Sequence, residues 1–303
     1  MAENYYYSGN IGSSSGSVID KPKVRKYVVV QSLWTKPLND NRKLRDTMYI
    51  CALSLAYAHR SGYKVHMHTD SNGYELLKNF GYDKIEKTLD SIPASVPTDL
   101  FAAGKFFAMK AEGVIGKVHI DTDVFIKKPI LDKFYEDISM DAICQMEEDM
   151  PLVDHSERIM HMHILGYPPT TRPNWQGSMN TGVVGFNNPV LAAKYFKNYF
   201  DSLKIYTADK IEKYKSENGY GCMCFDFVLE QIELSYLSVG YNVYTLLPTK
   251  NPCFVADEIG YQHLQGGTKW TTGSRTIIRE LLLKMDRSLY NAATIAAARI
   301  NKI

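Results

Sequence analysis

The stretch Lys117–Ile126 reads KVHIDTDVFI and decides most of what the sequence predicts about the fold. An apolar run ends at Ile120, two acidic residues follow at Asp121 and Asp123, and a second apolar run begins. Short apolar runs bounded by polar residues are typical of buried strands. In extended backbone, residues i and i+2 point to the same side. We therefore expect both carboxylates on one face at the end of a strand.

Strands and helices are predicted to alternate around this stretch. Further strands are expected at Tyr27–Leu33, Lys64–His68, Ala142–Gln145, Thr181–Phe186 and Tyr241–Leu247. Helices are expected at Arg42–Arg60, Tyr74–Phe80, Leu100–Glu112, Val190–Tyr206 and Phe225–Leu237. This alternation indicates an α/β fold with a mixed, mainly parallel sheet and helices on both faces. In such sheets ligands bind beyond the carboxyl ends of the strands, where Ser32–Thr35, Asp70 and Asp121 fall.

Three parts are predicted along the chain. Residues 1–24, rich in Tyr, Ser and Gly, are expected to be a flexible leader. Residues 25–272 form the main domain, and residues 273–303 form a C-terminal helical segment broken near Asp286. The segment Asp149–Trp175 is interpreted as a long loop that serves as a lid. Candidate acceptor contacts in it are His155, His161, His163 and Trp175, with an irregular surface loop as the alternative.

Composition excludes several classes of protein. The 35 Lys and Arg residues against 33 Asp and Glu leave a formal charge of +2, which gives no reason to expect a nucleic-acid partner. Five cysteines, with Cys222 and Cys224 in a C-x-C pair, make neither a disulfide framework nor a zinc site. Neither a secretory signal nor a membrane span is predicted, so we expect a cytoplasmic protein. Contact of the basic C-terminal segment with a membrane surface is considered and not favoured.

The paired carboxylates predict a metal site. Like charges on one face destabilise a fold unless a cation joins them. Hard oxygen ligands favour Mn²⁺ or Mg²⁺, which also bind diphosphate oxygens. An Asp-x-Asp triplet also occurs by chance on surface turns, and only its place after a strand favours the metal.

Three other motifs could carry chemistry. His263–Trp270 reads HLQGGTKW and combines a nitrogen ligand, glycines that admit phosphate to the backbone, and the point charge of Lys269. The triplet beginning at Asn180 suits sugar hydroxyls, since an amide both donates and accepts hydrogen bonds. Each is equally typical of a polar turn. Glu230 and Gln231, on a predicted helix, are by default surface residues.

Taken in order, these motifs resemble the retaining glycosyltransferases of family 8, which have the GT-A fold and include bacterial lipopolysaccharide galactosyltransferases and glycogenin. The resemblance covers Tyr27–Trp270 and looks closer to bacterial and phage relatives. The family motif His-x-x-Gly-x-x-Lys-Pro-Trp lacks its proline here, because Trp270 directly follows Lys269. Glu230 stands where the family usually has Asp, which puts the role of that acid in doubt.

The resemblance implies roles for particular residues. The metal would be held by Asp121, Asp123 and His263, and the diphosphate by Lys269 and the Gly266 backbone. The nucleotide and donor sugar would contact Ser32, Trp34, Thr35, Asp70, Lys105 and Thr122. The catalytic set would comprise Asn180 at the donor sugar, Gln231 beneath its reacting face, and Glu230.

The function expected from the sequence is a metal-dependent hexosyltransferase. It would move a sugar from a nucleotide diphosphate, with a UDP-sugar favoured, to an unidentified glycan, protein or small-molecule acceptor. The family resemblance implies retention of configuration. Alternatives are a non-catalytic nucleotide-sugar-binding or assembly protein, and a nucleotidyltransferase. The latter usually has a Gly-rich phosphate loop after the first strand, where Ser32–Pro37 reads SLWTKP.

Overall fold

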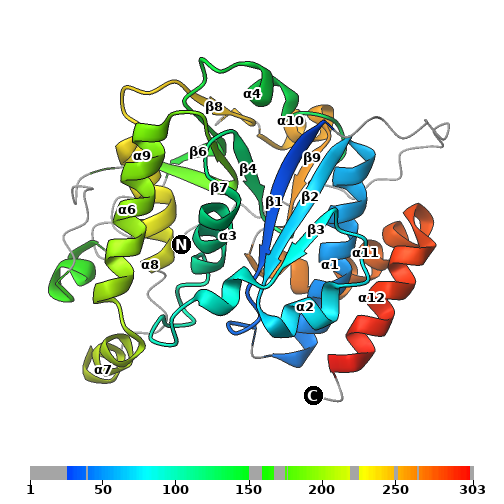
Figure 1. The fold of residues 1–303 in the computed structure, drawn as a ribbon, viewed down its shortest axis with the longest axis horizontal. Coiled ribbons are helices and arrows are strands. Elements are labelled where there is room, and N and C mark those ends of the chain that lie inside the picture. Colours follow the sequence, from blue (N-terminus) through cyan, green and yellow to red (C-terminus); the bar gives the residue numbers. More distant parts are fainter. Residues whose placement is uncertain are drawn as a thin grey trace. The chain divides into compact units, whose positions relative to one another are not determined.

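The computed structural model of the chain describes residues 26–38, 40–149, 159–166, 175, 177–218, 225–248, 252–264 and 266–300 (Figure 1). The chain divides into two compact units, each of which collects separate stretches of sequence. Unit 1 comprises Met1–Lys87, Asp121–Lys133 and Asn251–Ile303, and unit 2 comprises Thr88–Ile120 and Phe134–Lys250. Residues on both sides of the predicted boundary at 272 and 273 thus lie in unit 1.

Unit 1 is built on a parallel sheet of three strands in the order β3-β2-β1. The strands are β1 (Tyr27–Leu33), β2 (Tyr63–Thr69) and β3 (Lys84–Glu86). The register pairs Leu33 with Thr69, so β1 and β2 end level with each other. Helices α1 (Asn41–Arg60) and α2 (Ser71–Leu77) follow β1 and β2 and pack on β2.

The rest of unit 1 comes from distant parts of the chain. Strands β5 (Val124–Ile126) and β9 (Tyr261–His263) form an antiparallel pair. They are accompanied by α10 (Pro252–Ile259) and the 3₁₀ turn η3 (Gly266–Trp270). Helices α11 (Thr272–Met285) and α12 (Arg287–Arg299) pack against α1 and against each other (Figure 1). Asp286 ends α11 and caps α12 by accepting the Leu289 N–H, which confirms the predicted break there.

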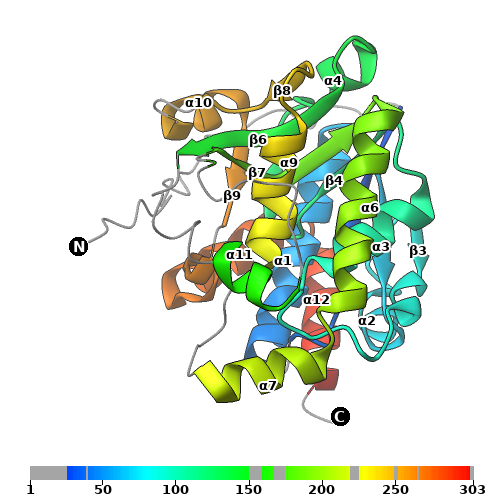
Figure 2. The same cartoon turned by 90° about the vertical axis from the view of Figure 1, so that its left-hand side faces the viewer.

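Unit 2 holds four strands in the order β4-β7-β6-β8. Strand β7 (Gly177–Phe186) pairs antiparallel with β4 (Lys117–Ile120) and β6 (Ala142–Asp149), and β6 pairs parallel with β8 (Val243–Thr245). Helices α6 and α9 lie beside β7 (Figure 2). The helical elements are η1 (Thr88–Ser91), α3 (Ala103–Glu112), α6 (Pro189–Ile205), α7 (Ala208–Asn218), α8 (Phe225–Phe227), the π-helical turn η2 (Val228–Ile232) and α9 (Glu233–Leu237). Helix α4 (Asp132–Glu136) contains one of the boundaries between the units, between Lys133 and Phe134.

The predicted α/β class with a mainly parallel sheet flanked by helices is confirmed. Helix α2 begins at Ser71 and not near Tyr74, because Asp70 caps it by accepting the Gly73 N–H. Residues 159–164 are helical, which corrects the predicted loop there; 150–158, 167–174 and 176 lie outside the described residues. The predicted leader and Cys222–Cys224 also lie outside. No described helix has the length and apolar character to cross a membrane.

We predict that Gly73→Ala destabilises the fold. A Cβ atom at this position would lie 2.0 Å from Thr69 Oγ1, which donates a hydrogen bond to the Leu33 carbonyl at 2.6 Å. Overpacking of this kind costs about 1–3 kcal/mol. Urea denaturation would measure the change in the free energy of unfolding.

The matched control is Gly273→Ala in α11, where a Cβ atom meets no neighbouring atom within 4 Å. There alanine should stabilise the protein by about 0.4–1 kcal/mol, because it restricts the unfolded chain. Equal effects of the two substitutions would contradict the packing described at the start of α2.

Candidate metal centre and its surroundings

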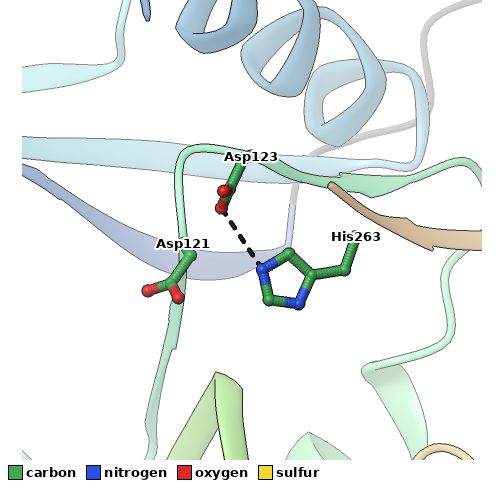
Figure 3. Close-up of side chains that lie close together, drawn as sticks. All are labelled: Asp121, Asp123 and His263. Carbon is green, nitrogen blue, oxygen red and sulfur yellow. Dashed lines mark ion pairs between the residues drawn. The ribbon is translucent and has the colours of Figure 1, made fainter. Parts of the chain in front are cut away.

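The Asp-x-Asp triplet lies in a tight turn between β4 and β5. The Val124 N–H donates to the Asp121 carbonyl at 3.0 Å and closes the turn. The extended i/i+2 arrangement expected from the sequence is therefore wrong for this triplet. The two carboxylates are brought together by the fold of the turn and by the strand that follows it (Figure 3).

Pairing of β5 with β9 brings His263 to the turn. Val124 lies opposite His263 in the ladder, and the Leu264 N–H donates to the Asp123 carbonyl at 3.1 Å. As a result, one ligand atom from each of Asp121, Asp123 and His263 lies within 4.8 Å of the others. Figure 3 shows the His263 imidazole facing the Asp123 carboxylate, with Nε2 3.4 Å from Oδ1. Asp123 and His263 are buried, and Asp121 is partly exposed.

Lys269, in η3, supplies the positive charge of this centre. Its Nζ donates to Asp123 Oδ2 at 2.6 Å and lies 5.5 Å from the centre of the Trp270 ring. Burial alone would raise the pKa of Asp123, but the Lys269 ammonium and the hydrogen bond to His263 hold it well below its usual value. Burial likewise disfavours the Lys269 ammonium, but Asp123 outweighs it and raises the pKa of Lys269. With two carboxylates and one ammonium, the centre retains negative charge that a divalent cation could neutralise.

Helix α1 holds the turn in place through two residues one helical turn apart. Ser54 Oγ donates to the Val124 carbonyl at 2.6 Å and accepts from Gln31 Nε2 at 2.7 Å. The side chain of Thr122 lies close to the Cys51 thiol. Burial raises the pKa of the Cys51 thiol to about 12, so it stays protonated at neutral pH.

Two of the residues predicted to contact the nucleotide, Thr35 and Asp70, are hydrogen-bonded to each other just after β1 and β2. The Asp70 carboxylate accepts the Thr35 N–H at 2.8 Å, the Thr35 hydroxyl, and the Gly73 N–H at 2.8 Å. Trp34 is buried, with Lys36 Nζ 6.0 Å from its ring centre, while Ser32 lies in β1 and is partly exposed. The structure thus joins Thr35 to Asp70, and a role in nucleotide binding stays a prediction for all four.

In unit 2, the predicted donor contact Lys105 forms a buried ion pair with Glu230. Lys105 Nζ also donates to the Thr181 carbonyl at 2.7 Å, and the Tyr195 hydroxyl donates to the Glu230 carbonyl at 2.9 Å. The side chains of Lys105 and Glu230 are only 8% and 6% exposed. Glu230 is therefore not the surface residue that a helical position suggests by default.

Gln231 and Asn180 lie in the same unit, on η2 and β7. Ser178 Oγ donates to Gln231 Oε1 at 3.4 Å. Asn180 Nδ2 donates to Glu148 Oε1 at 2.8 Å, and its Oδ1 accepts the Gly182 N–H at 3.0 Å. Sequence reasoning missed Glu148, because only the pairing of β6 with β7 brings it near Asn180.

Asp226 is a second buried acid that sequence reasoning missed. It accepts the Ala102 N–H at 2.7 Å and the Tyr199 hydroxyl at 2.9 Å. Burial raises its pKa well above the usual value, and the neighbouring Glu230 adds to the rise. A sequence signal existed, since Asp226 and Glu230 are four residues apart on a predicted helix and share one face.

The remaining candidates are placed as follows. Gly266 has φ +55° and begins η3, with no atom near the position of an added Cβ. His161 is buried and hydrogen-bonded to the Tyr214 hydroxyl, and His163 is exposed. Trp175 Nε1 donates to Ser235 Oγ at 3.2 Å. His155 lies outside the described residues.

A comparison with protein families finds that the model of DUF6734, described as a family of unknown function, matches residues 27–285. No curated protein matches the chain.

Similar solved structures include the glycosyltransferase GlyE of Streptococcus pneumoniae, at 12% identity and a TM-score of 0.40, covering 90% of this chain and 64% of GlyE. The chain thus spans less than two thirds of GlyE. An active-site mutant of LgtC has 12% identity and a TM-score of 0.39, with 86% and 95% covered. A CMP:2-keto-3-deoxy-manno-octonic acid synthetase complexed with CTP has 14% identity and a TM-score of 0.33, with 73% and 89% covered. Likenesses with these TM-scores assign no function to this chain.

We predict that Lys105→Met destabilises the protein by about 3–5 kcal/mol, because it leaves the Glu230 carboxylate buried without its counter-charge. The double substitution Lys105→Met with Glu230→Gln removes that charge and should recover a large part of the loss. Chemical denaturation of the three proteins would measure this. The control is Lys110→Met, an exposed lysine of the same helix, with an expected change below about 1 kcal/mol. Additive losses in the double variant would contradict a buried ion pair.

A pH dependence of stability follows from Asp226. Its folded-state pKa lies above the unfolded value, so its stabilising contribution is complete below the unfolded pKa and is lost as pH rises toward the folded pKa. Asp226→Asn removes this titration while keeping an acceptor for the Ala102 N–H. The free energy of unfolding of the variant, relative to wild type, should therefore increase as pH rises from about 4 to 8. Thermal unfolding across this range would test it, and a difference independent of pH would contradict it.

Proposed function

This chain belongs to DUF6734, a family of unknown function, and we propose that it is a metal-dependent glycosyltransferase that uses a nucleotide-diphosphate sugar. The observation that carries the proposal is the cluster of Asp121, Asp123 and His263 beside Lys269. This combination offers ligands for a divalent cation and an ammonium for phosphate oxygens within one small volume. Nucleoside diphosphates need both kinds of partner when they leave.

The residues of the cluster fit a bound Mn²⁺ or Mg²⁺. Two carboxylates and one imidazole are hard-to-intermediate ligands, and the nitrogen favours Mn²⁺ over Mg²⁺. The turn and the β5–β9 pair hold the ligand atoms near one another before any ion arrives. The ion, when bound, would supply charge neutralisation at the diphosphate.

The same centre could hold the diphosphate through two residues of η3. Lys269 already places its ammonium at Asp123, and a charged donor of this kind binds phosphate oxygens strongly. Gly266 has open space where a side chain would stand, so phosphate oxygens could approach the backbone. UDP is preferred as the nucleotide on the family resemblance, with Ser32, Trp34, Thr35 and Asp70 as its proposed contacts.

On the basis of the family resemblance, we assign Asn180 and Gln231 as contacts of the donor sugar. The same resemblance leads us to propose that transfer retains the configuration of the sugar. A leaving phosphate oxygen could accept the acceptor proton, so no strong protein base is required. Glu230 is satisfied by its pair with Lys105, which supports an electrostatic role more than a nucleophilic one. Glycosyl transfer is therefore proposed to depend on the metal centre and on hydrogen bonding to the sugar.

The test is nucleotide release from a panel of UDP- and GDP-sugars with Mn²⁺. We expect one donor to be hydrolysed slowly without acceptor. Asp123→Ala and Asp121→Asn should each lower this rate by about 10²-fold or more, the loss typical when charge stabilisation of the leaving group is removed. A chelator should abolish the rate in wild type.

The control variant is Asp209→Asn, an exposed aspartate of α7, which should release nucleotide at the wild-type rate. Circular dichroism would confirm that each variant is folded. Mn²⁺-dependent UDP binding with no turnover of any donor would favour a non-catalytic binding protein. Release of pyrophosphate from a nucleoside triphosphate would favour a nucleotidyltransferase. Absence of both binding and release would overturn the metal assignment.

A further inference from the structure

Unit 1 has a cavity that is open to solvent and lined by residues of α1, α11 and α12, with a volume of about 360 Å³. Pockets for small molecules fall in the range of about 300–1,000 Å³. Its walls are formed by small residues of α12 and by longer side chains of α1 and α11, among them Arg42, Arg45, Asp46, Tyr49, Arg275 and Arg279. None of the predicted metal ligands lines it.

The cavity carries a concentrated positive charge in a chain whose formal net charge is only +2. Four guanidinium groups line it against a single carboxylate, that of Asp46. Asp46 pairs with both arginines of α11, with Oδ2 2.7 Å from Arg275 Nε and Oδ1 3.2 Å from Arg279 Nη2. Asp46 is the one acidic residue among the residues that line the cavity, so arginine guanidinium groups predominate in its lining.

Arg275 has donor capacity that the described residues do not use. Its Nη2 is buried and finds no hydrogen-bond acceptor among the residues that the structure describes. A buried donor without an acceptor is destabilising, and in natural proteins such a group usually marks a bound water, ion or ligand. Arg279 makes a cation–π contact, since its Cζ lies 4.4 Å from the centre of the Tyr49 ring.

Helix α11 also contributes its positive end. Arg275 lies in its first turn, which contains no acidic residue and has the uncharged N-cap Thr271, whereas the N-terminus of α1, near Arg42, is capped by the Asp40 carboxylate. Cations are normally disfavoured there, because the helix dipole is positive at its N-terminus. Placing Arg275 near the N-terminus of α11 costs stability in the free protein. An anion bound beside it would relieve that cost.

We propose that this cavity binds a small molecule carrying a phosphate or diphosphate group. The guanidinium fork matches phosphate oxygens in geometry, and several forks around one cavity favour a group with two negative charges over a carboxylate with one. The volume leaves room for an organic portion beside the phosphate. The proposal does not depend on the glycosyltransferase assignment.

The test is calorimetric titration of the full chain with inorganic pyrophosphate in the presence of EDTA, so that no metal contributes. We expect saturable binding by wild type. Arg42→Gln combined with Arg45→Gln should weaken it at least tenfold. Both residues lie on the outer part of α1, so this variant should fold, and circular dichroism would confirm it.

The matched control is Lys43→Gln combined with Lys284→Gln, which makes the same charge change at exposed lysines of α1 and α11 that do not line the cavity. It should bind pyrophosphate nearly as tightly as wild type. No binding by wild type, or equal weakening in both double variants, would overturn the proposal, because the second result would indicate only the general charge of the surface.

A parallel experiment distinguishes a free phosphate from a lipid headgroup. Wild type and both double variants would be sedimented with phosphatidylcholine vesicles that contain or lack phosphatidic acid. Binding to phosphatidic acid that requires Arg42 and Arg45 would support the cavity and identify a membrane headgroup as the source. Pyrophosphate binding without vesicle binding would support the cavity and identify a soluble ligand.

Discussion

The burial of one carboxylate, that of Asp123, constrains the arrangement of unit 1 around the metal centre. A carboxylate that is only 6% exposed is strongly destabilising unless opposite charge and hydrogen bonds surround it. Lys269 and His263 meet that requirement, and both come from the part of the chain after residue 250. Pairing of β5 with β9 joins the Asp123 turn to the segment that contains His263. It places His263 opposite Val124, and the Leu264 N–H donates to the Asp123 carbonyl. The same interactions that permit the burial also assemble a set of ligands that could hold a divalent cation.

Unit 2 contains a comparable buried pair, Lys105 with Glu230, but its surroundings differ. Asp226 and the Tyr199 hydroxyl lie close by, and burial keeps the pKa of Asp226 well above normal. Here the polar groups satisfy one another in a network that also includes the Thr181 carbonyl. At the metal centre, by contrast, two carboxylates face a single ammonium and leave negative charge available for a ligand. Because of this difference in charge balance, the metal centre can take up a cation, whereas the buried Lys105–Glu230 pair already neutralises itself.

Several candidate binding residues make hydrogen bonds that stabilise the fold, independently of any role in ligand binding. Asp70 joins the ends of β1 and β2 through Thr35 and caps α2 through the Gly73 N–H. Asn180 is tied to Glu148 on the neighbouring strand. Polar residues at strand ends are therefore weak indicators of a ligand unless their hydrogen-bonding groups are also left available. The arginine cavity of α1 and α11 meets that stricter criterion through Arg275 Nη2, although none of its lining residues belongs to a recognisable motif.

Local sequence was sufficient to predict many of the elements and to single out candidate site residues. The apolar run of β1, the apolar stripe of α1 and the break at Asp286 depend on short-range periodicity and capping, so they could be predicted without tertiary information. Asp121 and Asp123 could likewise be identified from their position after a strand. Local sequence could not predict the conformation of their turn or the pairing of Lys105 with Glu230. Nor could it predict the burial of Asp226 or the convergence of four arginines. Each of these depends on contacts between residues far apart in the chain, and the free energy of burying a charge is determined only when tertiary packing decides which partner lies beside it.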